Sequence, residues 1–322
     1  MVNFVANNSD DEPTWIIDSG ATFHGVKDAN LLQNIVPCKT YFDGFFGEIS
    51  VAKHVGDACL SVISPTNETI SLDGVLHIPD LAYNVISVSR LTTDSPTLMV
   101  EFNSSGFFVK NFMTNELLAW GKKFGNYYFW PRPNDVFHRH RPKPDIKITV
   151  RSLMTALRNV FWGNLSNLVA LCADGFAKLV YTRTNPSKGE NCDGLWILDS
   201  GSPIHIASNV ALLEDHCPSA VKVYWGDLVG STHAATHVGN TYLGGPNHGM
   251  MLHSVQIVEG AKDNLISVAA LTSKNSCSVK FFSSGFALKS LEDDKIVATG
   301  IKFNNYYYLS DKSFQIFGTK QK

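Results

Sequence analysis

The hydrophobic positions along the chain form short apolar runs separated by turn residues. Helix-favouring runs are few, and short apolar or alternating segments bounded by Gly, Asn and Asp are typical of β-strands. The clearest strand candidates are residues 15–17, 58–64, 98–102, 106–110 and 126–129. The dipeptide Asp73-Gly74 is a strong hairpin signal and predicts two short strands within residues 69–78. We therefore predict an all-β fold with small helical turns, one of them within residues 81–91.

Two long segments of the chain repeat each other in order. WIIDSGA at residues 15–21 recurs as WILDSGS at residues 196–202, so Asp18 and Asp199 are equivalent (199 − 18 = 181). Further matches follow in the same order: residues 84–91 with 264–271, 104–107 with 283–286, and 121–129 with 300–308. The offset falls only to 179 (300 − 121 = 179), which indicates a tandem duplication with short insertions or deletions. Each unit has the size of a small domain, and two such units predict a pseudo-two-fold arrangement.

The stretch between the repeats, residues 131–192, has a different character. It opens with PRPNDVFHRHRPKP, whose prolines and basic residues predict a solvated linker rather than a nucleic-acid site. Apolar positions at helical spacing predict a helix around residues 150–162. The predicted organisation is a flexible N-terminal segment, a first lobe, a partly helical linker, a second lobe and a tail, at residues 1–14, 15–130, 131–192, 193–310 and 311–322.

Charge and hydropathy exclude two classes of protein. The 27 basic and 29 acidic side chains give a net charge of −2, whereas a general nucleic-acid binder has a clear basic excess. No apolar run reaches the ~20 residues of a membrane-spanning helix. The first residues, MVNFVANNSDDEPTW, lack the basic and apolar regions of a signal peptide. We therefore expect a cytoplasmic protein, or a secreted one if a signal peptide has been removed.

Neither a metal nor a cofactor is expected. The six cysteines are scattered without a CxxC pair, and they leave open whether any disulfides form. His233 and His237 have the spacing of a metal pair but lack the glutamate of a zincin motif. His24 and His205 follow the repeated Asp-Ser-Gly at the same distance in both repeats, and we expect each to make a structural hydrogen bond near that turn.

The repeated Asp-Ser-Gly tripeptide is the candidate chemistry. Asp18 and Asp199 each follow three apolar residues, at the edge of a core where an unpaired carboxylate is costly. One reading is an Asx-turn, in which each aspartate accepts hydrogen bonds from the following amides. The other is that a two-fold axis brings the two carboxylates together, where they share one proton and activate a water molecule. Glycine then allows a tight turn and a close approach of substrate, and the hydroxyls of Ser19 and Ser200 brace the two loops.

These motifs resemble a known family. Residues 15–24, WIIDSGATFH, fit throughout the W-I-hydrophobic-D-S-G-A-T-x-H segment that opens the aspartic protease of copia-type (Pseudoviridae) retrotransposon polyproteins. Residues 75–91, VLHIPDLAYNVISVSRL, are similar to the second motif of that family. The second repeat departs from the pattern, because Pro203 replaces a threonine and residues 255–264 keep less of the second motif. The chain thus resembles two divergent tandem copies of this retropepsin-like protease.

The resemblance implies two retropepsin-like lobes with pseudo-two-fold symmetry. Family proteases are homodimers in which each subunit supplies one aspartate, so two units in one chain imply a complete site. The implied catalytic residues are Asp18 and Asp199, with loop support from Ser19, Gly20, Ser200 and Gly201. The resemblance also implies glycine-bearing flaps, which we expect near Gly44, Gly47, Gly226 and Gly230, an ordinary surface turn being the alternative.

Two functions stay open at this point. The first is an aspartic endopeptidase that takes a polypeptide substrate. The second is an inactive retropepsin-fold protein, a domesticated protein or effector, that binds other proteins. The chain is expected to be a monomeric pseudo-dimer or a lobe-swapped dimer, since the long linker allows either.

Overall fold

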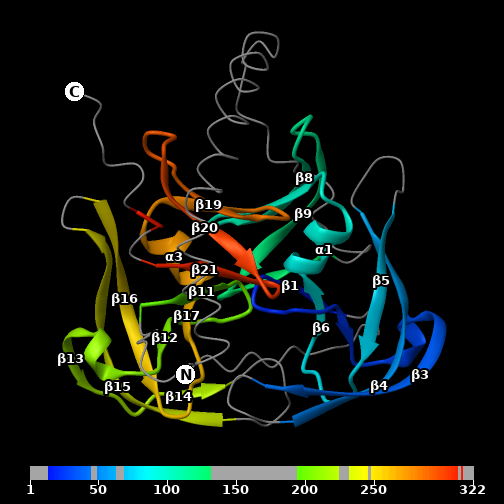
Figure 1. Cartoon of the computed structure of the whole chain (residues 1–322), viewed down its shortest axis with the longest axis horizontal. Helices are drawn as coiled ribbons and strands as arrows, with labels where there is room; N and C mark the ends of the chain where they lie inside the picture. The colour runs from blue at the N-terminus through cyan, green and yellow to red at the C-terminus, as the bar shows by residue number, and fades with distance from the viewer. Residues whose placement is uncertain are drawn as a thin grey trace.

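The computed structural model describes residues 14–44, 49–62, 69–131, 194–224, 232–245, 248–310 and 313–314. Most of these residues lie in strands, with short helical segments between them (Figure 1). This confirms the predicted all-β fold. The predicted linker helix around residues 150–162 falls outside the described ranges, and the lobe boundaries at 15–130 and 193–310 stay a prediction.

The first repeat contains ten strands and two short helical segments within the described residues. They are β1 (Trp15–Asp18), β2 (Gly25–Val26), η1 (Ala29–Leu31), β3 (Gln33–Asp43), β4 (Ile49–Ser61), β5 (Thr69–His77), β6 (Asn84–Ser87), α1 (Val88–Asp94), β7 (Leu98–Phe102), β8 (Gly106–Asn111), β9 (Leu117–Phe124) and β10 (Tyr127–Phe129).

The second repeat follows the same order of elements, with an additional strand, β14. Its elements are β11 (Trp196–Asp199), β12 (Ile206–Ala207), η3 (Val210–Leu212), β13 (Glu214–Pro218), β14 (Lys222–Tyr224), β15 (Thr232–Gly245), β16 (His248–Val258), β17 (Asn264–Ser267), α3 (Val268–Lys274), β18 (Cys277–Phe281), β19 (Gly285–Ser290), β20 (Ile296–Phe303) and β21 (Tyr306–Leu309). Among these described elements, no helix is both long and apolar enough to cross a membrane.

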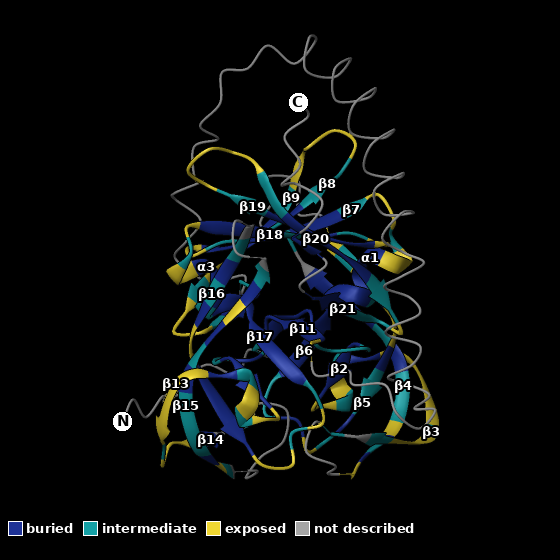
Figure 2. Cartoon of the chain, turned by 60° about the vertical axis from the view of Figure 1, so that its left-hand side comes forward, coloured by how far each residue is buried: buried dark blue, intermediate teal, exposed yellow. Residues whose placement is uncertain are grey.

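The candidate aspartates terminate the central strands of the two repeats. β1 pairs in parallel with β6 and antiparallel with β10, and β11 pairs in the same way with β17 and β21. All four residues of each strand are buried, and β11 lies among the dark ribbons at the centre of Figure 2. A strand covered on both faces carries a continuous apolar run rather than an alternating one. That is why WII and WIL precede Asp18 and Asp199, and why both aspartates lie deep in the protein.

The prediction of two short strands within residues 69–78 is wrong. These residues form one strand, β5, which pairs with β4 along its length except at a register shift between Gly56 and Ala58. Gly74 has a φ of 65° there, and its backbone N–H donates to the Asp57 carboxylate at 3.3 Å. Glycine tolerates this left-handed conformation, so the Asp-Gly dipeptide forms an irregularity inside a strand instead of a turn between two strands.

The helical turn predicted within residues 81–91 lies further along the chain. α1 begins only at Val88, and residues 84–87 form β6. Ser87 is the N-cap, and its hydroxyl accepts from the Arg90 backbone N–H at 3.1 Å. Ser267 caps α3 in the second repeat in the same way, through Ala270. A serine cap sets the start of a short helix more firmly than a brief apolar run does.

The largest hydrophobic cluster of the described residues extends across both repeats, and a smaller cluster lies within each repeat. The buried side chains of the largest cluster include Trp15 and Phe102 from the first repeat and Trp196 and Phe281 from the second. The Phe102 and Phe281 rings meet edge-to-face at a centroid distance of 5.6 Å. β7 pairs antiparallel with β18, so backbone hydrogen bonding also joins the repeats. The two Asp-Ser-Gly loops are therefore positioned relative to each other by a shared core and a continuous sheet.

Candidate functional site

The two Asp-Ser-Gly loops lock together through their serines. The backbone N–H of Ser19 donates to the Ser200 hydroxyl at 2.9 Å, and the N–H of Ser200 donates to the Ser19 hydroxyl at 2.9 Å. Each hydroxyl in turn donates to a carbonyl of the opposite central strand, Ser19 to Leu198 at 2.8 Å and Ser200 to Ile17 at 2.9 Å. Four buried hydrogen bonds thus brace the loops, as expected for two turns related by a two-fold axis.

The two aspartates face each other directly beyond this brace. Asp18 and Asp199 are only 4 % and 6 % exposed, and their side chains are hydrogen-bonded to each other. Gly201 contacts both carboxyl groups, because its N–H lies 2.7 Å from Asp199 Oδ1 and 3.2 Å from Asp18 Oδ1. Gly20 donates to Asp18 at 2.7 Å and Ser202 donates to Asp199 at 2.9 Å. Both readings of the motif therefore hold at once: each aspartate forms an Asx-type turn, and the two carboxyl groups are adjacent.

The environment of the pair favours retention of a proton. Burial raises the pKa of Asp18 well above its ordinary value, and the neighbouring charge of Asp199 raises it further. Hydrogen bonds from Gly20 and Gly201 oppose this shift in pKa without cancelling it. Two carboxyl groups that are hydrogen-bonded to each other cannot both ionise easily, so they titrate as a unit with one shared proton.

The glycines of the motif are needed for a reason that the sequence does not reveal. A Cβ on Gly20 would lie 2.6 Å from Asp199 Cγ, and a Cβ on Gly201 would lie 2.6 Å from Asp18 Cγ. Neither glycine has a positive φ. We predicted a role in a tight turn and in substrate approach. The structure instead shows that each glycine leaves room for the carboxyl group of the other repeat.

A second set of hydrogen bonds between the repeats holds the two loops from outside, and the sequence did not predict it. The Asn126 amide donates to the Pro203 carbonyl at 2.8 Å, and the Asn305 amide donates to the Thr22 carbonyl at 3.5 Å. Asn126 and Asn305 occupy the same place in the matched segments GKKFGNYYF and GIKFNNYYY. This match could have revealed the contact. Asparagine is disfavoured in strands, so its presence at the same turn of both repeats indicates another role.

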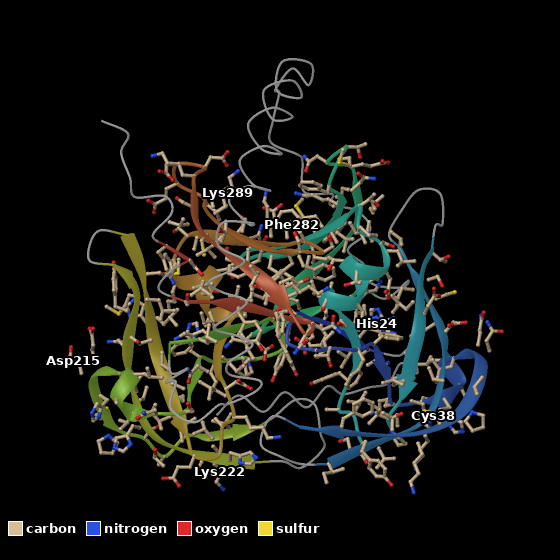
Figure 3. All side chains as sticks on the ribbon, in the orientation of Figure 1. His24, Cys38, Asp215, Lys222, Phe282 and Lys289 are labelled. Carbon is tan, nitrogen blue, oxygen red and sulfur yellow. The ribbon has the colours of Figure 1, made fainter. Side chains whose placement is uncertain are left out.

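His24 and His205 have the structural role that was expected. The ring nitrogen Nδ1 of His24 accepts from the Ser87 backbone N–H at 3.0 Å, and Nδ1 of His205 accepts from that of Ser267 at 3.1 Å. Burial, aided by the charge of Arg90, lowers the pKa of His24 to about 3, and burial with His253 lowers that of His205 to about 4. Both rings are neutral acceptors at physiological pH. His24, labelled in Figure 3, lies inside the first repeat.

Of the four residues predicted to belong to flaps, only Gly44 lies within the described residues. Gly44 follows β3, and its carbonyl accepts from the Lys262 ammonium of the second repeat at 3.2 Å. Gly47, Gly226 and Gly230 lie outside the described residues, as does nearly all of the predicted linker. No group of three or more metal-ligating side chains occurs among the residues that the structure describes.

Comparison with known proteins gives a match in the first repeat. Residues 15–95 match the family described as "Pol polyprotein, beta-barrel domain". The retrovirus-related Pol polyprotein from transposon RE2 of Arabidopsis thaliana is 33% identical over 131 residues, which cover 40% of this chain and 9% of the relative. The Pol polyprotein from transposon RE1 of the same plant is 38% identical over 100 residues, which cover 30% of this chain and 6% of the relative. These similarities support a retrotransposon Pol origin for the chain.

These matches cover only a small part of the relatives. The chain aligns with less than a tenth of the length of either Pol polyprotein. No solved structure matches the chain significantly. The family match includes the Asp-Ser-Gly segment of the first repeat and not that of the second.

Proposed function

We propose that this retrotransposon-derived chain is an aspartic endopeptidase in which Asp18 and Asp199 activate a water molecule. The observation that carries the proposal is the adjacency of the two carboxyl groups, together with the raised pKa of Asp18. A carboxyl pair that shares one proton contains an acid and a base in the same site. Hydrolysis of a peptide bond needs both groups at once.

The reaction follows from this single shared proton. The ionised carboxylate accepts a proton from water while the water oxygen attacks the carbonyl carbon of the peptide. The protonated carboxyl group of the pair donates to the carbonyl oxygen. The resulting tetrahedral diol collapses as a proton is transferred to the amide nitrogen and the C–N bond breaks. The products are a carboxylic acid and an amine, and the pair again holds one proton.

The protein's own contribution is to hold the pair in position. The serine brace fixes the two loops, and the backbone N–H groups of Gly20, Gly201 and Ser202 orient the carboxyl oxygens. A preorganised pair does not need to rearrange during the reaction, which is the largest advantage that such a site provides.

A protein-binding function is the second candidate. It is favoured by the near-complete burial of both carboxyl groups and by the departure of the second repeat from the family pattern at Pro203. In this alternative the carboxyl pair is a remnant that joins the repeats, and the surface of the fold recognises another protein. A fold by itself does not establish an activity.

Cleavage of an unfolded protein substrate across pH ~4–7 separates the two candidates, since a shared-proton pair works in this range. The proposal predicts cleavage by the wild type and its loss in both Asp18→Asn and Asp199→Asn, whereas Glu116→Gln, which changes an exposed carboxylate, remains active. A wild type that is folded by circular dichroism and cleaves nothing would contradict the proposal and favour the binding function.

A further inference from the structure

The seam between the repeats lies on the pseudo-two-fold axis. β7 and β18 pair antiparallel, with Val100 opposite Phe281, Glu101 opposite Lys280, and Phe102 opposite Val279. These strands occupy equivalent places in the two repeats (280 − 101 = 179), the same offset as in the flanking sequence matches. A residue on such an axis faces its own counterpart, so Glu101 and Lys280 are the same position in the two repeats.

The other paired positions of β7 and β18 do not discriminate between partners. Val100 and Val279 are counterparts, and so are Phe102 and Phe281. Pairing β7 with β18 gives two Val–Phe pairs, and pairing either strand with a second copy of itself would give the same two. Phe282, labelled in Figure 3 and situated just after β18, packs edge-to-face on Phe112 of the first repeat at a centroid distance of 5.2 Å. The counterparts of these two residues are Asn103 and Leu291, so this contact also favours the mixed pairing. The Val–Phe pairs themselves hold the seam together without selecting the partner.

The axial position does discriminate, because its two residues have opposite charges. Lys280 Nζ lies 3.6 Å from Glu101 Oε1, and Lys110 Nζ lies 2.7 Å from Glu101 Oε2. The side chains of Glu101 and Lys280 are only 13% and 24% exposed. Burial by itself raises the pKa of Glu101, but the two lysines outweigh it and the pKa lies below its ordinary value. The glutamate is therefore ionised and bound between ammonium groups.

Like pairing would place equal charges on the axis. Two first repeats would bring Glu101 against a second Glu101, and two second repeats would bring Lys280 against a second Lys280. Lys110 stays beside Glu101 in the former case. In the latter case Lys289, the counterpart of Lys110 (289 − 110 = 179), is paired with Asp294, so the repulsion arises from the two charges on the axis itself. Partly buried charges of the same sign repel more strongly than exposed ones, because the local dielectric constant is lower.

We propose that Glu101 and Lys280 form a specificity pair that makes the first repeat associate with a second repeat and not with another first repeat. The partner that β7 fits is a strand with a central basic residue, which this chain itself supplies. The pair thereby selects assemblies that contain one Asp18 and one Asp199, and it disfavours sites with two copies of either. Specificity by charge at one central position needs both an attractive match and a repulsive mismatch, and the seam provides both.

Charge reversal in the full chain tests the proposal. Glu101→Lys makes both axial residues basic, and Lys280→Glu makes both acidic. Each single variant is expected to unfold about 5 °C or more below the wild type, since an unpaired buried charge is strongly destabilising. The matched control Glu116→Lys reverses an exposed charge outside the seam and is expected to unfold within about 1–2 °C of the wild type. The double variant restores an opposite pair, and we expect it to recover at least half of the lost melting temperature and to keep the wild-type mass.

A mixture of the two single variants provides an independent test of partner choice. Each variant finds opposite charges only in the other, so co-expressed chains of distinguishable mass are expected to form mixed assemblies in excess over self-assemblies by native mass spectrometry. If the single variants are too unstable to purify alone, recovery of soluble protein by the double variant or by co-expression gives the same information.

Three results would overturn the proposal. They are single variants as stable as Glu116→Lys, a double variant no more stable than the single variants, or self-assembly of the single variants as frequent as mixed assembly. None of these measurements depends on peptide cleavage, so the outcome is separate from that of the proposed endopeptidase activity.

Discussion

Ser19 and Ser200 each receive a hydrogen bond from the other's backbone N–H, at 2.9 Å in both directions. Because each hydroxyl also donates to the opposite strand, every hydrogen-bonding group in this brace depends on the other repeat. The brace is buried, and unsatisfied buried polar groups are costly. The relative position of Asp18 and Asp199 is therefore coupled to the pairing of the two repeats.

Removal of one hydroxyl should break the brace. Ser19→Ala leaves the N–H of Ser200 and the carbonyl of Leu198 without this partner, so we expect it to lower the free energy of unfolding by about 1–3 kcal/mol. Ser200→Ala should cost a similar amount, because its contacts are equivalent. Urea denaturation of both variants, with the exposed Ser104→Ala as control, measures the effect. A loss no greater than that of Ser104→Ala would show that the brace contributes nothing to stability.

A methyl group on the glycine of either Asp-Ser-Gly loop should displace the opposite carboxyl group. Gly20→Ala and Gly201→Ala place a Cβ within 2.6 Å of Asp199 Cγ and Asp18 Cγ respectively. We expect a loss of about 1–3 kcal/mol in the free energy of unfolding from the enforced shift. If the chain cleaves peptides, its activity should fall roughly 100-fold, since a displacement of about 1 Å is enough for such a loss.

Gly194→Ala is the matched control for these two variants. Gly194 has open space around the position of a Cβ and no positive φ. Its substitution should leave the stability and activity near wild-type values. Equal losses in Gly194→Ala and Gly20→Ala would show that glycine acts there through backbone freedom and not through space for the carboxyl group.

The sequence predicts the parts of this site that are local and repeated, and fails where the geometry between the repeats decides. Trp15-Ile16-Ile17-Asp18 could be interpreted as a buried strand ending in a polar turn, and the second copy suggested that two aspartates meet. The clash that excludes a side chain at Gly20 was not predictable, because it involves Asp199, 179 positions away (199 − 20 = 179).

The strand errors have a similar origin. Asp73-Gly74 has the local signature of a hairpin, yet its partner is Asp57 on the neighbouring strand β4. Tertiary pairing therefore overrides the local preference at Gly74. The charge reversal between Glu101 and Lys280 was visible in the aligned repeats, but it acquires a meaning only once β7 and β18 are known to meet on the axis.

The buried histidines should make the protein less stable in acid. The pKa values of His24 and His205 fall from 6.5 to about 3 and about 4 on folding. The unfolded chain therefore binds more protons than the folded one between these values and pH 6.5, so stability is lost as the pH falls through this window. At pH 5 each histidine should lower the free energy of unfolding by about 2 kcal/mol relative to pH 7.

Asp18 has the opposite linkage, because its raised pKa makes the folded state the better proton acceptor above pH 3.8. Its contribution therefore favours folding at acid pH and partly offsets that of the histidines. Urea denaturation from pH 4 to 8 should show a less steep acid loss in His24→Gln, whose amide oxygen can accept from the Ser87 N–H but does not titrate. An unchanged pH dependence in both His24→Gln and His205→Gln would contradict this assignment.

Two buried tyrosines extend the two-fold pattern of contacts into the core. Tyr128 OH donates to the Asn103 carbonyl at 3.1 Å and contacts the Thr272 hydroxyl at 3.2 Å. Tyr307 OH donates to the Phe282 carbonyl at 3.1 Å and contacts the Thr92 hydroxyl at 3.0 Å. Each phenol thus joins a turn of its own repeat to the short helix of the other, and burial raises the pKa of both.

Tyr128→Phe and Tyr307→Phe should each lower the free energy of unfolding by about 1–2 kcal/mol, because a buried threonine hydroxyl and a carbonyl lose a partner while the ring still fills the core. The exposed Tyr41→Phe is the control, since its ring remains available to Lys39. Equivalent contacts in the two repeats require equivalent losses, within about 0.5 kcal/mol. A loss confined to one tyrosine would mean that the two-fold relation of the backbone does not extend to the energetics of the contacts between the repeats, those of Glu101 and Lys280 included.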